Sequence, residues 1–201
     1  MNSDLPSDLH GDLYRDVTDF AHDTPGWVHT LAEYGTEGGL LILLALLAAA
    51  CWRVRHAEPR VLARALLGPV GVAVAYGISE AVKVVVREER PCRAVVGAAV
   101  PIAPCPEPGD WSFPSNHATI AVASAVAVVV VWRAAAWLAL PLALSTAFSR
   151  VFVGVHYPHD VAAGAVLGTV VVLLVTWAAV GPAAVLADRV RARLGYTSPA
   201  S

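Results

Sequence analysis

Charged residues are scarce in this sequence, and their scarcity restricts the class of protein that it can encode. Only 15% of the 201 residues are charged, whereas 57% are hydrophobic. Soluble globular chains carry about 25% charged and roughly 45–50% apolar residues. A soluble protein of this composition could not cover its surface with polar groups, so the excess apolar residues require lipid as their solvent. The composition therefore excludes a soluble domain and a disordered chain.

An excess of basic residues is also missing, as is a cysteine pattern typical of metal sites. The chain has 14 Lys and Arg against 16 Asp and Glu, so no nucleic-acid partner is expected. Its three cysteines include no C-x-x-C pair, which argues against a zinc site. Cys51 lies in an apolar segment. Cys92 and Cys105 share a proline-rich loop, and the sequence leaves open whether they form a disulfide or remain free thiols.

Long apolar segments make up most of the chain. A helix needs about 20 predominantly apolar residues to cross a bilayer. The pattern predicts an all-α integral membrane bundle with about five transmembrane helices. The third and fourth segments are short and joined tightly at Arg133, which predicts a helical hairpin. The expected spans are 38–52 with 27–37 as its outer end, then 61–86, 117–132, 134–148 and 161–186.

The first 23 residues are acidic rather than apolar. Aspartates recur about every four residues, which places most of the carboxylates on one side of a helix, and apolar residues follow a helical spacing on another side. We expect an amphipathic helix at the membrane interface, since the segment lacks the basic start of a signal peptide. The aspartates are Asp4, Asp8, Asp12, Asp16, Asp19 and Asp23, and the apolar residues are Leu9, Leu13, Val17 and Phe20.

The positions of Lys and Arg predict how the bundle lies in the membrane, because cytoplasmic loops are enriched in these residues. Most of the basic residues in the loops 87–116 and 149–160 belong to the polar clusters described below, where a functional role can override the topology preference. The remaining arginines lie mostly at the opposite ends of the spans. We therefore expect both loops and the amino terminus on the extracytoplasmic face of the plasma membrane. The predicted organisation is an amphipathic segment 1–26, a membrane-embedded domain 27–187 and a basic cytoplasmic tail 188–201.

The first of three polar clusters lies at the outer end of the second span. Lys83, Arg87 and Arg90 recur at intervals of four and three, which places them near one another on a helical face. Such a group of cations attracts an anion, although a basic helix end also serves as an interface anchor. For Arg87 we expect a contact with an outer phosphate or a salt bridge with Glu80 or Glu88.

The second cluster, Phe113-Pro114-Ser115-Asn116-His117, directly precedes the third span. Pro and Ser are favoured where a helix begins. A helix start presents unpaired backbone N–H groups, which suit a phosphate. Taken alone, the cluster favours a plain helix cap beside an interfacial histidine.

The third cluster runs from Ser149-Arg150 to His156 and Asp160, between the fourth and fifth spans. A carboxylate four residues after a histidine can accept a hydrogen bond from one ring nitrogen, which leaves the other nitrogen free as a base or nucleophile. A purely structural hydrogen bond would show the same spacing.

All three clusters fall at the same face of the membrane, and this shared placement favours a common site. Cations and backbone amides stabilise the charge of a phosphoryl group, one histidine can attack it, and another can protonate the leaving group. The sequence offers no acidic cluster to hold magnesium, so we expect neither a metal nor a cofactor.

The clusters resemble the three-part signature of the type-2 phosphatidic acid phosphatase superfamily, which also includes vanadium haloperoxidases. Its pattern is K-x6-RP, then PSGH, then SR-x5-H-x3-D, and the order and spacing match here across residues 61–182. Asn116 stands where the pattern usually has Gly. The resemblance implies that His156 is the nucleophile, that Asp160 orients it and that His117 is the general acid. It also implies a phosphate-binding set of Lys83, Arg90, Ser115, Asn116 and Arg150.

The stretches 112–119 and 149–160 are similar to bacterial undecaprenyl diphosphate phosphatases of the bacitracin-resistance type. The resemblance implies a lipid phosphate substrate in the bilayer, with undecaprenyl diphosphate as the first expectation. A phosphatidylglycerophosphate or phosphatidate phosphatase and a lipid phosphotransferase share every motif. A transporter or a binding protein is the alternative outside enzymes, although the chain shows no internal repeat. The oligomeric state is left open.

Overall fold

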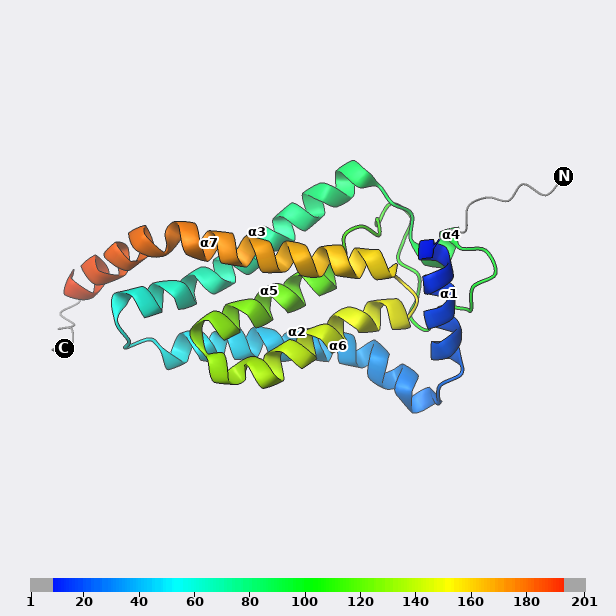
Figure 1. The fold of residues 1–201 in the computed structure, drawn as a ribbon, viewed down its shortest axis with the longest axis horizontal. Coiled ribbons are helices and arrows are strands. Elements are labelled where there is room, and N and C mark those ends of the chain that lie inside the picture. The colour runs from blue at the N-terminus through cyan, green and yellow to red at the C-terminus, as the bar shows by residue number, and fades with distance from the viewer. Residues whose placement is uncertain (1–8, 194–201) are drawn as a thin grey trace.

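The computed structural model describes residues 9–193, and every regular element in this range is helical (Figure 1). The all-α class is confirmed. Residues 1–8 and 194–201, which carry Asp4, Asp8 and the end of the expected tail, lie outside the described residues. The elements are α1 (Leu9–His22), α2 (Gly26–Arg53), α3 (Pro59–Val86), α4 (Pro91–Ala94), α5 (Asn116–Val131), the 3-10 turn η1 (Arg133–Ala135), α6 (Ala136–Phe152) and α7 (Pro158–Arg193).

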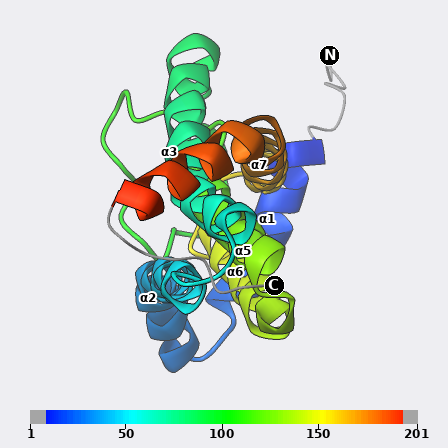
Figure 2. The same cartoon turned by 90° about the vertical axis from the view of Figure 1, so that its left-hand side faces the viewer.

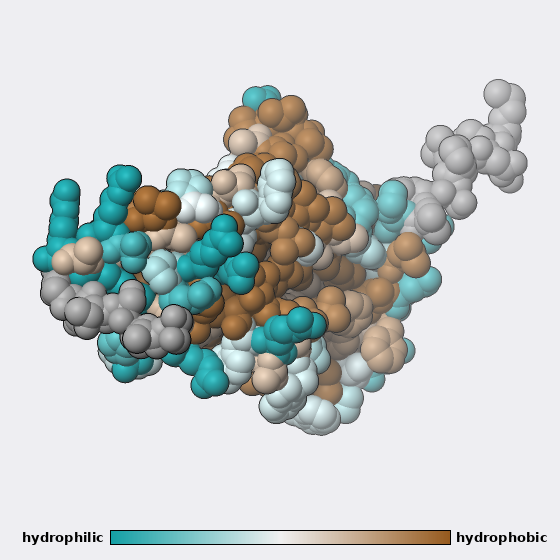
Figure 3. Space-filling model, turned by 60° about the vertical axis from the view of Figure 1, so that its left-hand side comes forward, coloured by the Kyte–Doolittle hydropathy of each residue, from teal (hydrophilic) through white to brown (hydrophobic). Residues whose placement is uncertain are grey.

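Five apolar helices match the five expected spans. Four of them are long and apolar enough to cross a membrane, and α5 is a shorter apolar helix of 16 residues. Segment 27–37 does form the outer end of the first span, because α2 is continuous from Gly26 to Arg53. The fourth span begins and ends later than predicted, since η1 takes up residues 133–135 and α6 continues to Phe152. Figure 3 shows the broad apolar surface of this multi-pass membrane protein, with hydrophilic residues gathered toward its ends.

Helix α5 lies at the centre of the bundle and packs against α2, α3, α6 and α7 (Figures 1 and 2). Nine of its 16 residues are buried, and most of these nine are alanines and valines. Glycines allow α7 to approach it closely: a side chain at Gly164 would overlap the backbone oxygen of Ser115, and one at Gly168 would overlap that of Thr119. This close approach aligns the start of α5 with the start of α7, where the Ser115 N–H donates to the Asp160 carbonyl over 3.0 Å.

Helix α1 lies across one end of the bundle (Figure 1). The amphipathic helix is confirmed over Leu9–His22, but its predicted apolar stripe is not the face that packs. Leu13 and Phe20 are exposed, whereas Tyr14, Thr18 and Ala21 are buried. The Tyr14 hydroxyl donates to the Gly154 carbonyl over 2.8 Å, so hydrogen bonding to the loop before α7 selects this face. The apolar stripe is left to face outward, as suits an interfacial helix.

Candidate active site

All three predicted clusters meet at the end of the bundle where α1 and α4 lie (Figure 1). The end of α3 and the loop after it supply the first cluster, the start of α5 supplies the second, and the α6–α7 connection supplies the third. The tight packing of α5 against its neighbours brings these helix ends together. The sequence-predicted site residues at this end are Lys83, Arg90, Ser115, Asn116, His117, Arg150, His156 and Asp160.

At the centre of the site is the buried pair of His156 and Asp160, which are 2% and 0% exposed. His156 Nδ1 lies 3.1 Å from Asp160 Oδ2, the oxygen that also accepts from the Ser112 hydroxyl and from the Tyr157 N–H. Burial, together with the charge of Arg90, holds the pKa of His156 well below its ordinary value, although Asp160 opposes the shift. The imidazole is therefore neutral at pH 7, with its proton on Nδ1 and a lone pair on Nε2.

The buried guanidinium of Arg90 points at that lone pair. Its Nη1 lies 3.0 Å from His156 Nε2 and donates to the Val155 carbonyl over 3.0 Å. Its other nitrogens donate to Asp110: Nε to the backbone oxygen over 2.9 Å and Nη2 to the carboxylate over 2.8 Å. Positive charge is thus held beside the free nitrogen of the histidine, where a phosphoryl group would gain most from it.

The carboxylate of Asp110 lies between two cations of the predicted phosphate site. Its Oδ1 is 2.8 Å from Arg90 Nη2 and 3.8 Å from Lys83 Nζ, and Lys83 also donates to the Trp111 carbonyl over 2.7 Å. Partial burial opposes ionisation, yet the hydrogen bond and charge of Arg90, aided by Lys83, hold the pKa of Asp110 below its usual value. The sequence pattern contains no signal for this contact.

Arg150 supplies a further cation. Within the part of the chain that the structure describes, its Nε is buried without a hydrogen-bond partner. Its backbone carbonyl accepts from the N–H groups of Val155 and His156, each over 3.2 Å, which ties the end of α6 to the loop that carries His156. A buried guanidinium nitrogen with an unused donor is suited to an anionic ligand.

The start of α5 has the predicted capping geometry. Ser115 is the N-cap, and its buried hydroxyl accepts from the Ala118 N–H over 3.5 Å. Asn116 begins the helix with ordinary right-handed backbone angles, so its replacement of the usual Gly causes no strain. Its side chain joins α5 to α3, because its amide donates to Glu80 and its oxygen accepts from the Ser79 hydroxyl over 2.7 Å.

His117, in the first turn of α5, contacts α2. Its Nε2 is 2.8 Å from Glu37 Oε1 on α2, a partner that the sequence pattern does not indicate. The charges of Arg90 and Arg150 act on both His117 and His156. Two imidazoles are therefore subject to the same two cationic charges, an arrangement that suits a nucleophile paired with a general acid.

Arg87 differs from its expectation. It ends α3 in the left-handed region with φ 52°, and its exposed side chain donates to the Val84 carbonyl of its own helix. Among the described residues neither expected salt bridge forms, because Asn116 binds Glu80 and His159 binds Glu88. Its proposed contact with an outer phosphate remains a prediction.

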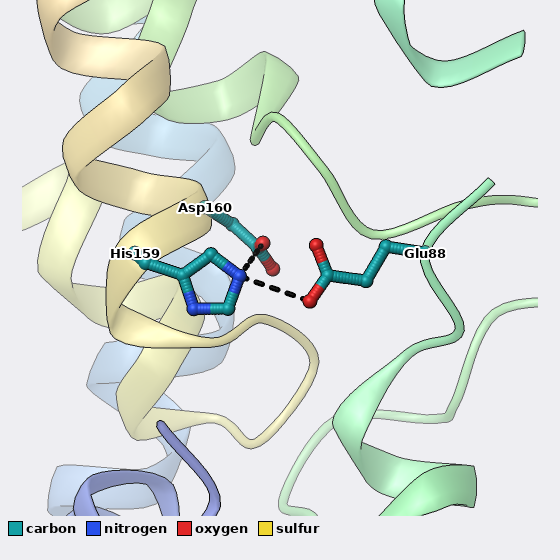
Figure 4. Close-up of side chains that lie close together, drawn as sticks. All are labelled: Glu88, His159 and Asp160. Atoms are coloured by element: carbon teal, nitrogen blue, oxygen red, sulfur yellow. Dashed lines mark hydrogen bonds and ion pairs between the residues drawn. The ribbon is translucent and has the colours of Figure 1, made fainter. Parts of the chain in front are cut away.

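A second group of titratable side chains adjoins Asp160 (Figure 4). His159 Nε2 lies 2.9 Å from Glu88 Oε1 and 3.3 Å from Asp160 Oδ1. One ligand atom from each residue lies within 4.8 Å of the others, so this trio is the set of described residues that could hold a metal ion. The expectation of a site without metal stays a prediction.

The loop between α4 and α5 is closed by a disulfide. The sequence left the state of these thiols open, and the structure joins Cys92 to Cys105 with a Cα–Cα distance of 6.0 Å. Arg93 adds a second link, because its guanidinium donates to the Pro106 carbonyl. The same loop continues to Asp110, whose carboxylate contacts Arg90 and Lys83.

Known proteins share both the sequence pattern and the fold. Residues 64–182 match the PAP2 superfamily. The chain is 36% identical to a decaprenylphosphoryl-5-phosphoribose phosphatase of Mycobacterium tuberculosis over 154 residues, covering 74% of this chain and 78% of the relative. It is 34% identical to the undecaprenyl-diphosphatase BcrC of Bacillus subtilis over 148 residues, covering 72% of this chain and 67% of the relative.

The fold matches the crystal structure of a transmembrane PAP2 type phosphatidylglycerolphosphate phosphatase from Bacillus subtilis. The TM-score is 0.59 at 20% identity, and the match covers 82% of this chain and 83% of the other. LpxE from Aquifex aeolicus matches with a TM-score of 0.57 at 19% identity, covering 83% of this chain and 94% of the other. The match to the family covers more than half of this chain, and the chain therefore belongs to the PAP2 superfamily of membrane phosphatases.

Proposed function

We propose that the protein hydrolyses the terminal phosphate of a polyprenyl lipid through a phosphohistidine at His156, with undecaprenyl diphosphate as the substrate. The observation that carries this proposal is the orientation of His156. Its Nδ1 is held by buried Asp160, and its Nε2 faces the guanidinium of Arg90. A neutral imidazole in this orientation is a ready nucleophile beside a site for phosphoryl oxygens.

In the first step, His156 Nε2 attacks the terminal phosphorus and the bond from phosphorus to the bridging oxygen breaks. His117 donates its proton to that oxygen, and the lipid leaves as its monophosphate. Arg90, Arg150 and Lys83 hold the phosphoryl oxygens, which requires Arg90 to turn from the His156 lone pair toward the phosphate. The positive charge formed on the imidazole is stabilised by Asp160.

In the second step, water attacks the phosphohistidine. His117 takes a proton from the water, the new bond from oxygen to phosphorus forms, and the bond from phosphorus to Nε2 breaks. Inorganic phosphate leaves, and the neutral His156 is restored with its proton still on Nδ1. Glu37, 2.8 Å from His117 Nε2, would orient this imidazole for both proton transfers.

Two observations support a polyprenyl substrate. The relatives from Mycobacterium tuberculosis and Bacillus subtilis, aligned over more than two thirds of this chain, are named for decaprenyl and undecaprenyl lipids. A groove of about 520 Å³ between α3 and α7 also begins at Phe113 and Pro114, next to Ser115. It is lined by Val82, Val166 and other apolar side chains, so an isoprenoid chain lying there would bring its phosphate to the site.

We propose that the site faces the extracytoplasmic side of the plasma membrane. Disulfides persist in oxidising compartments, and the Cys92–Cys105 bridge lies at the end of the bundle that holds the site. At the opposite end, Arg53 and Arg55 lie in the connection from α2 to α3, and Arg191 binds the backbone there. This distribution of basic residues agrees with a cytoplasmic opposite end.

The test is phosphate release by the purified protein in detergent with excess EDTA, from four lipids in parallel. These are undecaprenyl diphosphate, decaprenylphosphoryl-5-phosphoribose, phosphatidylglycerophosphate and phosphatidate. We expect the fastest release from the diphosphate and none from His156→Ala. Faster release from the phosphoribose lipid, which the relative from Mycobacterium tuberculosis favours, or from a glycerolipid would reassign the substrate. Release that survives in His156→Ala would overturn the phosphohistidine, and transfer of phosphate to an added alcohol would indicate a phosphotransferase.

A further inference from the structure

Glu88 and His159 form a pair directly beside the catalytic carboxylate, and the mechanism above does not use them. His159 precedes Asp160 in the first turn of α7, and Glu88 lies in the loop after α3, two residues before Arg90. Figure 4 shows one nitrogen of the imidazole facing both carboxylates, with Nε2 at 2.9 Å from Glu88 Oε1 and 3.3 Å from Asp160 Oδ1. One ring nitrogen therefore faces both acids.

The ring of His159 is fixed in this orientation by its aromatic neighbours. It stacks on Tyr157 with 5.2 Å between ring centroids, and Phe113 lies 5.9 Å away on the same measure. The edge of His10 on α1 approaches it at 4.3 Å. A side chain packed on three sides can hold a hydrogen-bond donor in one place.

The proton of His159 is assigned by the surroundings of its two nitrogens. Nδ1 is buried without a hydrogen-bond partner among the described residues, whereas Nε2 faces two carboxylates. A hydrogen on Nε2 fits this arrangement, since that nitrogen binds Glu88 and also faces Asp160.

The two carboxylate oxygens of Asp160 differ in their hydrogen-bond partners. Oδ2 accepts from Ser112, His156 and Tyr157. Oδ1 is buried and has no hydrogen-bond partner among the described residues, and His159 Nε2 lies 3.3 Å from it at ion-pair distance. A buried carboxylate oxygen without a partner is costly, so loss of this N–H would remove the stabilising contact of Oδ1 and weaken the hold on the orientation of Asp160 toward His156.

Glu88 also connects the loop that carries Arg90 to Asp160, the partner of His156. The Glu88 carbonyl accepts from the Ser112 N–H over 2.8 Å, and the Ser112 hydroxyl donates to Asp160. Glu88 is thus attached to Asp160 by two routes, through His159 and through Ser112. Because Arg90 follows Glu88 closely in a short loop, these links fix the guanidinium relative to His156.

We propose that His159 is a positioning residue of this site: its Nε2–H, held by Glu88, also attracts the Oδ1 oxygen of Asp160 and reduces the repulsion between the two carboxylates. Asp160 can then keep its other oxygen on His156. The inference rests on the proposed phosphohistidine mechanism and adds two residues to it. The distance of 2.9 Å between Nε2 and Oε1 is that of a direct hydrogen bond, so the trio needs no metal ion.

The experiment compares two replacements of His159. His159→Gln keeps an N–H near the position of Nε2, and His159→Met keeps the bulk without the donor. Because one hydrogen bond to a charged group is lost, we expect His159→Met to lower kcat by about 10- to 100-fold. KM should stay within about twofold, since His159 does not bind the phosphate, and His159→Gln should recover most of the lost kcat.

A second substitution tests whether His159 reduces the repulsion between the carboxylates of Glu88 and Asp160. Without the His159 donor, the carboxylates of Glu88 and Asp160 face each other, so Glu88→Gln added to His159→Met should raise kcat again by about fivefold, equivalent to roughly 1 kcal/mol. Glu89→Gln is the matched control: it removes a carboxylate from the same loop, but Glu89 pairs with Arg93 outside the site. It should give no recovery. If His159 has a purely structural role, Glu88→Gln in the His159→Met background should instead lower kcat further.

Wild type and His156→Ala, run beside these variants, test the proposed function separately. The thermal unfolding midpoint in detergent tests the pair without turnover: His159→Met should lower it, and added Glu88→Gln should restore part of the loss. Unchanged kcat in His159→Met, or no coupling to Glu88 in either measurement, would overturn the proposal. Wild-type activity that falls with EDTA and returns with zinc, but only while His159 is present, would assign the trio to a metal and also overturn it.

Discussion

Replacing Asp110 with Asn should strengthen the binding of inorganic phosphate. In the structure the Asp110 carboxylate occupies the space between Arg90 and Lys83, where a phosphate oxygen is expected. A phosphate that enters must displace this carboxylate and is repelled by it. Asparagine keeps the shape of the side chain and leaves the backbone carbonyl that accepts from Arg90 Nε, so the substitution removes chiefly the charge.

The size of the effect follows from the contact. A hydrogen bond between charged groups contributes about 1.5–3 kcal/mol when buried. The Asp110 side chain is 52% exposed, so water screens the pair and about 1 kcal/mol is the fitting value. Lys83, at 3.8 Å, adds a smaller contribution of the same sign. The gain of about 1 kcal/mol corresponds to an inhibition constant for phosphate that is about fivefold lower.

The assay is competitive inhibition of lipid hydrolysis by inorganic phosphate at constant ionic strength. Glu107→Gln serves as the control, because it removes an exposed carboxylate from the same loop without a contact to either cation. Its inhibition constant should match that of wild type. If Asp110→Asn binds phosphate more weakly than wild type, the carboxylate orders Arg90 rather than competing for it, and the reasoning is refuted.

Three further predictions concern stability and specificity. Burial lowers the pKa of His156 in the folded protein, so the unfolded chain alone takes up a proton as the pH falls below about 6.5. The thermal midpoint should therefore drop between pH 7.5 and 5, and the drop should be smaller in His156→Gln; equal drops would contradict the assignment. Cys92→Ser with Cys105→Ser should lower the free energy of unfolding by about 3 kcal/mol, measured by denaturant titration in detergent, and no loss would exclude a stabilising bridge. Val166→Trp should obstruct the groove between α3 and α7, raising KM for a long polyprenyl substrate more than for a short-chain analogue; equal changes would place the chain elsewhere.

Much of the fold and the principal site residues could be predicted from the sequence, because the signals involved are local. The length of an apolar segment is measured along the chain, so the five spans were recognisable without knowledge of their packing. The spacing from His156 to Asp160 is one helical turn, which predicts the contact that the structure shows at 3.1 Å. The cap at Ser115 is equally local.

The partners of these residues depended on the tertiary structure. Glu37 meets His117 across a separation of 80 residues, and Glu88 meets His159 across 71. Asp110 reaches Arg90 through a loop whose path no spacing rule specifies. In α1 the apolar stripe indicated a helix but not its docked face, because a hydrogen bond from Tyr14 to Gly154 selects that face.

The sequence by itself determined that the chain is a helical membrane protein with cationic residues and histidines gathered at one end. Only the tertiary structure determined which carboxylate lies on which cation or imidazole. The physical reason is that periodicity and hydrophobicity act over one or two helical turns. The pairings of Glu37, Glu88 and Asp110 arise when α5 packs against its neighbours and their ends meet.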